Sequence, residues 1–282
     1  MGTDARPLAG RNAYVTGGGS GIGKACARAF LVDGASVTLV GRNEEKLQAA
    51  VDDLSGDVTD GASLGWSAAD VADEDAVRAS VAVALERGGG ALHLAVAAAG
   101  IGTLGPVIAT PLSEWQKVLD TNLTGTFLTF KHAGAAIARS GGGALCAISS
   151  IAGVRTHPHG GAYAVSKAGV DMLVRTLADE LGLAGVRVNS VCPGLVDTEI
   201  SAGLFATDAV LADYLDQMPI RRTGVVDDVA AAVRYLCGPE AGWVTGVSLS
   251  VDGGQHLRRG PDWSPIARML YGDDVVEGRH TP

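Results

Sequence analysis

The sequence has few cysteines, and none of them stands in a metal or redox motif. Cys26, Cys146, Cys192 and Cys237 are the four, and no two of them form a Cys-x-x-Cys pair. This spacing argues against a zinc site and against dithiol redox chemistry. Their mostly apolar surroundings are typical of small core residues, and free thiols are typical of a reducing compartment.

Positive charge and long hydrophobic runs are also scarce. Lys and Arg together number 22 against 31 Asp and Glu, for a formal net charge of -9, so the phosphate backbone of a nucleic acid would be repelled. No apolar stretch approaches the ~20 residues that span a bilayer, and residues 1–11 contain no apolar signal run. We therefore expect a cytoplasmic protein with no nucleic-acid partner and no membrane partner.

Glycine and apolar residues are abundant instead. The 282 residues suffice for one large α/β domain or two small ones. Of them, 40 are glycine and 47% are hydrophobic, so a sizeable core is possible. Short apolar runs that end in glycine alternate with segments whose apolar residues recur at helical spacing. This alternation predicts a parallel sheet covered by helices on both faces, without an internal repeat or an interdomain linker.

A glycine-rich turn follows the first expected strand, residues 12–16. The next residues are spaced Gly17-x-x-x-Gly21-x-Gly23 and open a helical pattern. Backbone N–H groups at a helix N-terminus attract anions, and glycines let a pyrophosphate approach closely. No Gly-Lys-Ser/Thr follows, so the turn is not a nucleotide-triphosphate loop. A flexible loop without a ligand is the alternative. The residues expected to contact a dinucleotide are Gly17, Gly19, Ser20, Gly21, Ile22 and Gly23.

The second expected strand, residues 36–40, indicates the cofactor type. Folds of this kind place an Asp or Glu there to bind the ribose 2′-hydroxyl of NAD, whereas this chain has Gly41 followed by Arg42. An arginine offers a forked donor to a 2′-phosphate. NADP(H) is therefore the preferred cofactor, and NAD(H) is possible. The alternatives are that Arg42 caps a solvated turn or stacks on adenine.

Two further strand ends extend this cofactor site. Residues 64–69 lead to Asp70 and Val71, where a carboxylate can accept from an adenine amino group, although a turn or helix-cap role is as good an explanation. The apolar run 92–98 leads to Gly100. Small side chains there, with Ala98, leave room for a ribose or a nicotinamide.

Tyr163 and Lys167 are the strongest candidates for chemistry. They are four positions apart, so they share one face of a helix. A nearby ammonium lowers the pKa of a phenol and would let it exchange a proton with an alcohol or carbonyl near neutral pH. The alternative is a helix in which both side chains merely pack. Ser150 follows the fifth expected strand, residues 144–149, at the end where ligands bind to open parallel sheets.

The remaining segments suggest partners. The helix expected over residues 163–181 is apolar on more than one face, which predicts a homo-oligomer, either a dimer or a tetramer. The weaker pattern over about 195–222 suggests a substrate loop, and its Leu204, Phe205, Leu211, Tyr214 and Leu215 favour an apolar or alicyclic substrate. A tail over 255–282 follows, which docks over a neighbouring subunit or over the pocket.

Three other features are explained without a metal. His157 and His159 have no third ligand at a fitting spacing, so no metal is expected and they are assigned to a loop lining or a solvated turn. Arg221 and Arg222 are assigned to solvent or to a subunit contact. Asn122, in the helical region 113–139, either satisfies backbone groups at a kink or binds an ordered water.

Together these separated motifs resemble the short-chain dehydrogenase/reductase family, from about residue 8 to residue 254. Residues 16–23 match its cofactor turn, and Asp70 with Val71 matches its adenine-pocket acid. Its serine stands 13 positions before its tyrosine, which selects Ser150 over Ser149. One departure is Ala97-Ala98-Ala99-Gly100 where the family has Asn-Asn-Ala-Gly, which puts local support of the sheet in doubt. The matches to the catalytic tetrad and to the nicotinamide-contacting segment are Asn122, Ser150, Tyr163 and Lys167, and Pro193, Gly194, Val196 and Thr198.

The resemblance implies a fold and an activity. The fold would be α/β, a single-domain doubly wound Rossmann-like parallel sheet of about seven strands, with residues 1–254 as the dinucleotide-binding and catalytic domain. Tyr163 would be the general acid/base, Lys167 would lower its pKa and bind the nicotinamide ribose, Ser150 would donate to the substrate oxygen, and Asn122 would hold a water in a proton relay.

The reaction implied is hydride transfer between the nicotinamide and a small ketone or secondary alcohol. One rival is a catalytically silent cofactor-binding sensor or scaffold, against which the intact tetrad argues. A second is epimerisation or dehydration of a nucleotide-sugar, which the short C-terminal region disfavours.

Overall fold

Seven parallel strands form one sheet in the order β3-β2-β1-β4-β5-β6-β7. The computed structural model describes residues 6–258 and 262–279; parts of the N-terminal segment and of the expected tail lie outside these residues. The strand order reverses between β1 and β4, and in open α/β sheets ligands bind in the crevice beside such a reversal. The strands are β1 (Asn12–Thr16), β2 (Ser36–Gly41), β3 (Leu64–Ala68), β4 (Leu94–Ala97), β5 (Gly143–Ile148), β6 (Val186–Pro193) and β7 (Ser248–Val251).

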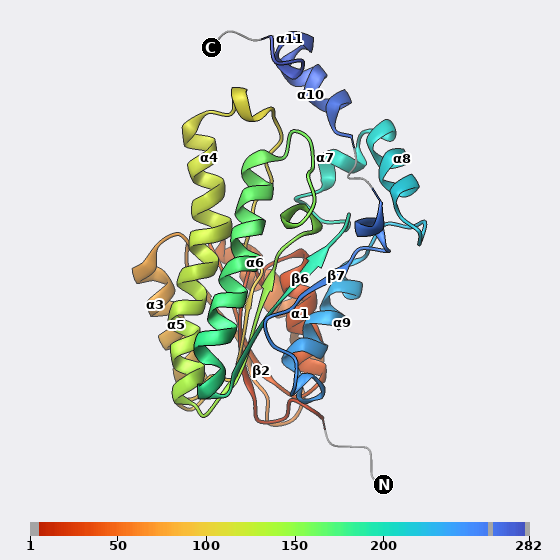
Figure 1. Cartoon of the computed structure of the whole chain (residues 1–282). Coiled ribbons are helices and arrows are strands. Elements are labelled where there is room, and N and C mark those ends of the chain that lie inside the picture. The colour runs from red at the N-terminus through yellow and green to blue at the C-terminus, as the bar shows by residue number, and fades with distance from the viewer. Residues whose placement is uncertain (1–5, 259–261, 280–282) are drawn as a thin grey trace.

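Helices cover both faces of this sheet (Figure 1). On one face lie α1 (Gly21–Val32), α2 (Glu44–Leu54) and α9 (Val226–Cys237), and on the other lie α3 (Glu74–Arg87), α5 (Gly125–Arg139) and α6 (Gly161–Leu181). The sequence signals the start of α2, because Asn43 caps it by accepting from the backbone N–H of Lys46 at 2.8 Å. The predicted doubly wound architecture is confirmed.

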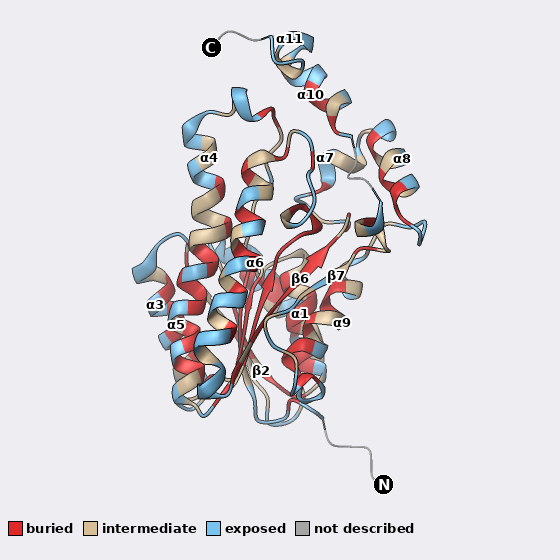
Figure 2. Cartoon of the chain, viewed as in Figure 1, coloured by how far each residue is buried: buried red, intermediate tan, exposed pale blue. Residues whose placement is uncertain are grey.

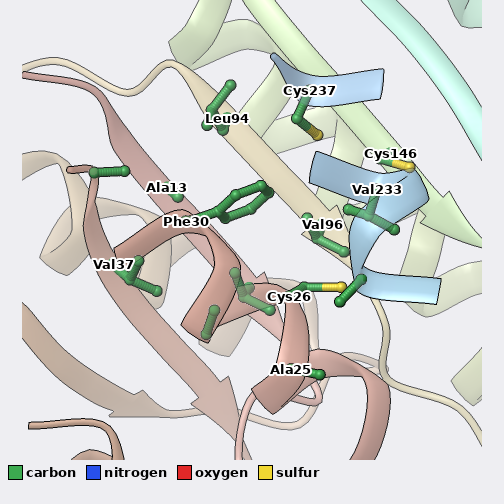
Figure 3. Close-up of a cluster of buried hydrophobic side chains, with 14 of the residues drawn as sticks. Ala13, Ala25, Cys26, Phe30, Val37, Leu94, Val96, Cys146, Val233 and Cys237 are labelled. Carbon is green, nitrogen blue, oxygen red and sulfur yellow. The ribbon is translucent and has the colours of Figure 1, made fainter. Parts of the chain in front are cut away.

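Alternation along each strand builds two hydrophobic cores. Val15 of β1 and Val96 of β4 face α1 and α9, whereas Tyr14 and Ala95 face α3, α5 and α6. Buried residues therefore fill the centre of the molecule and the inner faces of the helices (Figure 2). Figure 3 shows the first core, in which Phe30 lies among strand residues. All four cysteines are free and buried, as expected of small core residues.

The expected helical region 113–139 is one helical rod with a local change of winding. α4 (Leu112–Leu119) continues through a π-helical turn, η3 (Asp120–Thr124), into α5. Asn122 lies in this turn, and π-turns inside helices are frequent at functional sites.

Other boundaries differ from the expected ones by small amounts: β6 extends two residues beyond the expected 191, and α6 begins two residues before Tyr163. Short 3-10 turns occupy η1 (Ser55–Asp57), η2 (Val107–Ala109), η4 (Ile151–Gly153), η5 (Gly182–Ala184), η6 (Pro239–Ala241) and η7 (Gln255–Leu257).

A small lobe lies beyond the carboxyl ends of the strands (Figure 1). It contains α7 (Ala202–Phe205) and α8 (Asp208–Gln217) of the expected substrate loop, and α10 (Ser264–Tyr271) and α11 (Asp273–Val276) of the tail. Tyr214 and Met218 pack with Trp263 and Ile266 in a third apolar cluster. The tail therefore docks on the chain's own substrate segment. No helix in the described part of the chain has both the length and the apolar character needed to span a bilayer.

Candidate functional site

A cavity of about 990 Å³ opens at the carboxyl ends of the strands. Among the residues expected at the site, only Gly19 and Asn122 do not line it: Gly19 packs near Lys46, and Asn122 lies behind the wall. The expected site residues that line the cavity are Gly17, Ser20, Gly21, Ile22, Gly23, Arg42, Asp70, Val71, Ala98, Gly100, Ser150, Tyr163, Lys167, Pro193, Gly194, Val196 and Thr198.

The glycine-rich turn provides a close-fitting backbone cradle at one end of this cavity. Gly17 and Gly21 have φ values of +65° and +50°, which side chains rarely adopt. A Cβ on Gly23 would lie 2.3 Å from the carbonyl oxygen of Gly17, so the turn and the start of α1 are in direct contact. The Ser20 side chain makes no capping bond to the described backbone, which leaves the N–H groups of α1 available to an anion. These features fit the pyrophosphate of a dinucleotide.

At the end of the cavity that follows β2, Arg42 has an exposed and weakly paired side chain. Its side chain is 62% exposed, and its guanidinium lies 3.9 Å from the Asp70 carboxylate, which is a weak ion pair. Asp70 also accepts from the backbone N–H of Ala72 at 3.0 Å. The turn role considered for Asp70 is thus present in the structure, and the same side chain also faces the cavity.

At the opposite end, the end of β5 and the first turns of α6 bring Ser150, Tyr163 and Lys167 together. The ammonium of Lys167 lies 5.6 Å from the centroid of the Tyr163 ring and donates to the carbonyl oxygen of Ile148 at 2.7 Å. Ser150 hydrogen-bonds the Tyr163 hydroxyl. The neighbouring Ser149 points elsewhere and donates to the carbonyl oxygen of Lys167 at 3.2 Å. Geometry therefore agrees with the spacing argument that selects Ser150.

The pKa of Tyr163 shifts in the direction opposite to the one expected. Burial raises the pKa of its phenol, although the hydrogen bond from Ser150 lowers it in part. Burial also lowers the pKa of Lys167 to about 8, against the charge of Asp171, which raises it. The pKa of Tyr163 therefore lies above its ordinary value, contrary to the expected lowering, because desolvation is the largest cause. At neutral pH the phenol is a proton donor.

Asn122 is fully buried, and its side chain holds two segments together. Its Oδ1 accepts from the backbone N–H of Ile101 at 2.8 Å, and its Nδ2 donates to the carbonyl oxygen of Ile101 at 2.9 Å and to Ser166 Oγ at 3.1 Å. Both amide protons are thus used, and one lone pair of Oδ1 remains. A methyl group on Gly100 would lie 3.3 Å from this Oδ1 and 3.7 Å from Lys167 Nζ.

Thr16, the first residue of the cofactor-turn motif, has a supporting role that the motif did not indicate. Its hydroxyl oxygen accepts from the backbone N–H groups of Ala98 and Ala99 at 3.2 and 3.3 Å. These bonds tie β1 to the segment after β4, at Ala98, where the family has an asparagine, and at the neighbouring Ala99. Thr16 therefore supplies support that had been in doubt. The sequence feature that could have indicated this role is the position of Thr16 as the last residue of the first strand.

The part of the cavity beyond Tyr163 is mostly apolar. In the described chain it has no Lys or Arg, and its carboxylate, Glu199, is paired with Lys46 at 2.7 Å. The tail contributes to this wall. Of the two locations expected for the tail, a neighbouring subunit or the pocket, the structure therefore shows the pocket. The lining residues from the substrate loop and the tail include Leu195, Ile200, Leu204, Tyr214, Trp263, Ile266, Met269 and Leu270.

The two histidines of the loop before α6 have separate partners. His157 Nδ1 bonds to the carbonyl oxygen of Arg155 at 3.1 Å, and His159 Nε2 to Ser264 Oγ at 3.2 Å. Burial lowers the pKa of His157, so its ring is neutral at pH 7. Within residues 6–258 and 262–279, no three His, Cys, Asp or Glu side chains are grouped as metal ligands would be.

Comparison with known proteins adds a family model and close structural neighbours. A model described as enoyl-(acyl carrier protein) reductase matches residues 17–256. A 3-oxoacyl-(acyl-carrier-protein) reductase of Chlamydia muridarum is 35% identical over 88% of this chain and 98% of its own length. The 3beta-hydroxysteroid dehydrogenase 1 of Eggerthella lenta is 36% identical over 90% and 96%. A solved short-chain type dehydrogenase/reductase from Mycobacterium ulcerans superposes with a TM-score of 0.93 at 40% identity, covering 96% of this chain and 98% of that one.

Proposed function

The chain belongs to the short-chain dehydrogenase/reductase family, and from this premise we propose that it transfers hydride between NADP(H) and an apolar, alicyclic ketone or secondary alcohol. Family membership makes it an NAD(P)-dependent oxidoreductase that acts on CH–OH groups or the corresponding carbonyls. The observation that carries the proposal is the convergence of Ser150, Tyr163 and Lys167 on one wall of the cavity. The relatives described above are all named as enzymes, so a silent sensor finds no support among them.

The chain's own residues suffice for the proton chemistry of carbonyl reduction. Nicotinamide would supply the hydride, held by the glycine-rich turn, Arg42 and residues 193–198. Ser150 Oγ accepts from the backbone N–H of Ala152 at 3.1 Å, and its proton, which faces the Tyr163 hydroxyl in the chain alone, would turn to the substrate oxygen when a substrate binds. Tyr163, protonated at neutral pH, gives its proton to the same oxygen. Lys167 then stabilises the phenolate. Asn122 holds the backbone of Ile101, next to Gly100, in place through hydrogen bonds.

The substrate class follows from the cavity wall. Apolar side chains surround the region beyond Tyr163, and the acid there is paired with Lys46. An ionised substrate would lose its hydration in this region without a counter-charge. Leu204 of α7, Ile266 of α10 and Trp263 provide the broad apolar contacts that a ring system needs, and Phe205 packs behind them in the third apolar cluster.

A carbonyl panel assayed with both cofactors tests the proposal. We expect alicyclic ketones to oxidise NADPH faster than NADH, because Arg42 can bind a 2′-phosphate in fork geometry. Arg42→Ala should lower kcat/KM for NADPH by roughly 10- to 100-fold, the range of one charge-assisted interaction, and should leave the value for NADH nearly unchanged. The measurement is the absorbance of reduced nicotinamide under initial-rate conditions.

Lys46→Ala is the matched control, because Lys46 is the nearby cation on α2 but already pairs with Glu199 at 2.7 Å. It should leave the cofactor preference in place. A wild-type preference for NADH in kcat/KM, or an equal effect of both variants, contradicts the assignment of Arg42. Absence of turnover with every carbonyl of the panel contradicts the proposed reaction.

We also propose that α5 and α6 form a subunit interface. Their outer faces expose Phe127 at 44%, Val165 at 49% and Met172 at 56%, and helices that are apolar on more than one face are usually covered. Light scattering after size exclusion should give a dimer or tetramer mass at micromolar concentration. Val165→Glu with Met172→Glu should shift that mass toward the monomer, and a wild-type monomer contradicts the proposal.

A further inference from the structure

A second phenol lies in the same cavity as Tyr163. Tyr214 comes from α8 and is only 4% exposed, yet it lines the cavity wall. A charge on Tyr163 would raise the pKa of Tyr214 further, and both side chains line the same cavity. The reaction described above does not use this hydroxyl.

The orientation of the Tyr214 hydroxyl is fixed by the tail. Its oxygen accepts a hydrogen bond from Trp263 Nε1 at 3.1 Å, and both residues are buried. An indole N–H can only donate, so the phenol oxygen is the acceptor. The proton of Tyr214 is therefore left over, and no atom of the described residues accepts it. A buried hydroxyl without an acceptor is costly, unless something in the cavity accepts its proton.

The tail itself is held in place, so this donor keeps one direction. Trp263 meets the ring of His157 edge-on with centroids 5.7 Å apart. Farther along the tail, the Tyr271 hydroxyl donates to the carbonyl oxygen of Leu104 at 2.9 Å. Ser264 bonds His159 at 3.2 Å. The tail thus contacts both the loop before α6 and the segment at Leu104. These contacts position Trp263 before a substrate arrives.

We propose that Tyr214 is a specificity-determining residue whose hydroxyl, oriented by Trp263 of the tail, donates a hydrogen bond to a second oxygen of the substrate. The substrate class becomes an alicyclic ketone or alcohol with a neutral acceptor oxygen remote from the reacting carbon. This proposal rests on the proposed function for the identity of the reacting end. The second oxygen satisfies the donor that the protein leaves open, and the apolar wall binds the rings between the two oxygens.

Binding to the complex with oxidised cofactor tests this proposal without any turnover. The probes are two matched pairs, cyclohexanone with 1,4-cyclohexanedione and 5α-androstan-3-one with 5α-androstane-3,17-dione. Their dissociation constants are measured by calorimetry on the wild type saturated with NADP⁺ or NAD⁺. We expect the diketone of at least one pair to bind about 3- to 10-fold more tightly than its monoketone, the range of one neutral hydrogen bond.

Three variants separate the hydroxyl from the packing. Tyr214→Phe keeps the ring and should remove the preference for the diketone. Trp263→Phe removes the indole N–H and should reduce the preference, which keeps the proposal testable if Tyr214→Phe does not fold. Tyr235→Phe, a hydroxyl deletion on α9 outside the cavity lining, should retain the preference.

Two outcomes overturn the proposal: equal binding within both pairs by the wild type, or a preference that survives in both Tyr214→Phe and Trp263→Phe. Binding of neither pair overturns the proposed substrate class. Hydride transfer to other carbonyls is measured separately, so a failure of the second anchor is distinguishable from a failure of the proposed reaction.

Discussion

Replacement of Tyr163 with phenylalanine is expected to lower kcat for carbonyl reduction by roughly 10²- to 10⁴-fold, the contribution of a positioned general acid. The substitution removes one oxygen and retains the ring beside Lys167. Because Tyr163 lies at the substrate end of the cavity, the affinity for NADPH should be nearly unchanged. Initial rates give kcat, and a fluorescence titration of NADPH gives the dissociation constant.

Tyr235→Phe is the matched control, since Tyr235 lies on α9 with its ring partly exposed, outside the cavity lining. It should have wild-type kinetics. A Tyr163→Phe variant that keeps kcat within about tenfold of the wild type would remove the general-acid role, because that loss is smaller than this catalysis supplies. A parallel loss of NADPH affinity would indicate a structural role instead.

The pH profile gives a second readout of the same arrangement. The pKa of Lys167 is lowered to about 8, so its ammonium is present at pH 7 and is lost as the pH rises through that value. Tyr163 remains protonated there, because burial raises its pKa. Reduction should therefore decline above pH 8 through loss of the cation that stabilises the phenolate. Lys167→Arg should move any residual decline to higher pH, since arginine stays charged.

The sequence was most informative where the chemistry depends on neighbours in the chain. The cofactor turn is such a case, because residues 16–23 contain the strand end, the glycines and the helix start together. Tyr163 and Lys167 are another, since a spacing of four within a helix fixes their common face. The alternation of apolar residues in β1 and β4 likewise indicates a sheet covered on both sides.

The sequence was least informative where the outcome depends on distant partners. The pKa of Tyr163 rises because of burial, which is a property of the whole fold and not of the four-residue spacing. Asn122 uses its amide on Ile101 and Ser166, and neither partner is suggested by its own helix. The bond between Trp263 and Tyr214 joins two segments 49 residues apart. Only the folded chain brings the tail to the substrate loop.

Replacement of Gly23 with alanine is expected to disrupt cofactor binding although it adds one methyl group. That methyl would lie 2.3 Å from the carbonyl oxygen and 2.7 Å from the carbonyl carbon of Gly17. Both atoms belong to the backbone, so the contact can be relieved only if α1 moves away from the turn. The N–H groups at the start of α1 would then leave the position in which they can bind a pyrophosphate.

The expected result is at least about a tenfold weaker NADPH affinity, the effect of losing one or two such backbone contacts. Overpacking should also lower the free energy of unfolding by about 1–3 kcal/mol, measured by urea denaturation. Gly19→Ala is the matched control in the same turn, because its methyl would lie 3.5 Å from the nearest atoms, which is an ordinary contact. Equal NADPH affinity in the two variants would mean that the cradle tolerates movement of α1, and that the close contact between Gly17 and Gly23 serves packing alone.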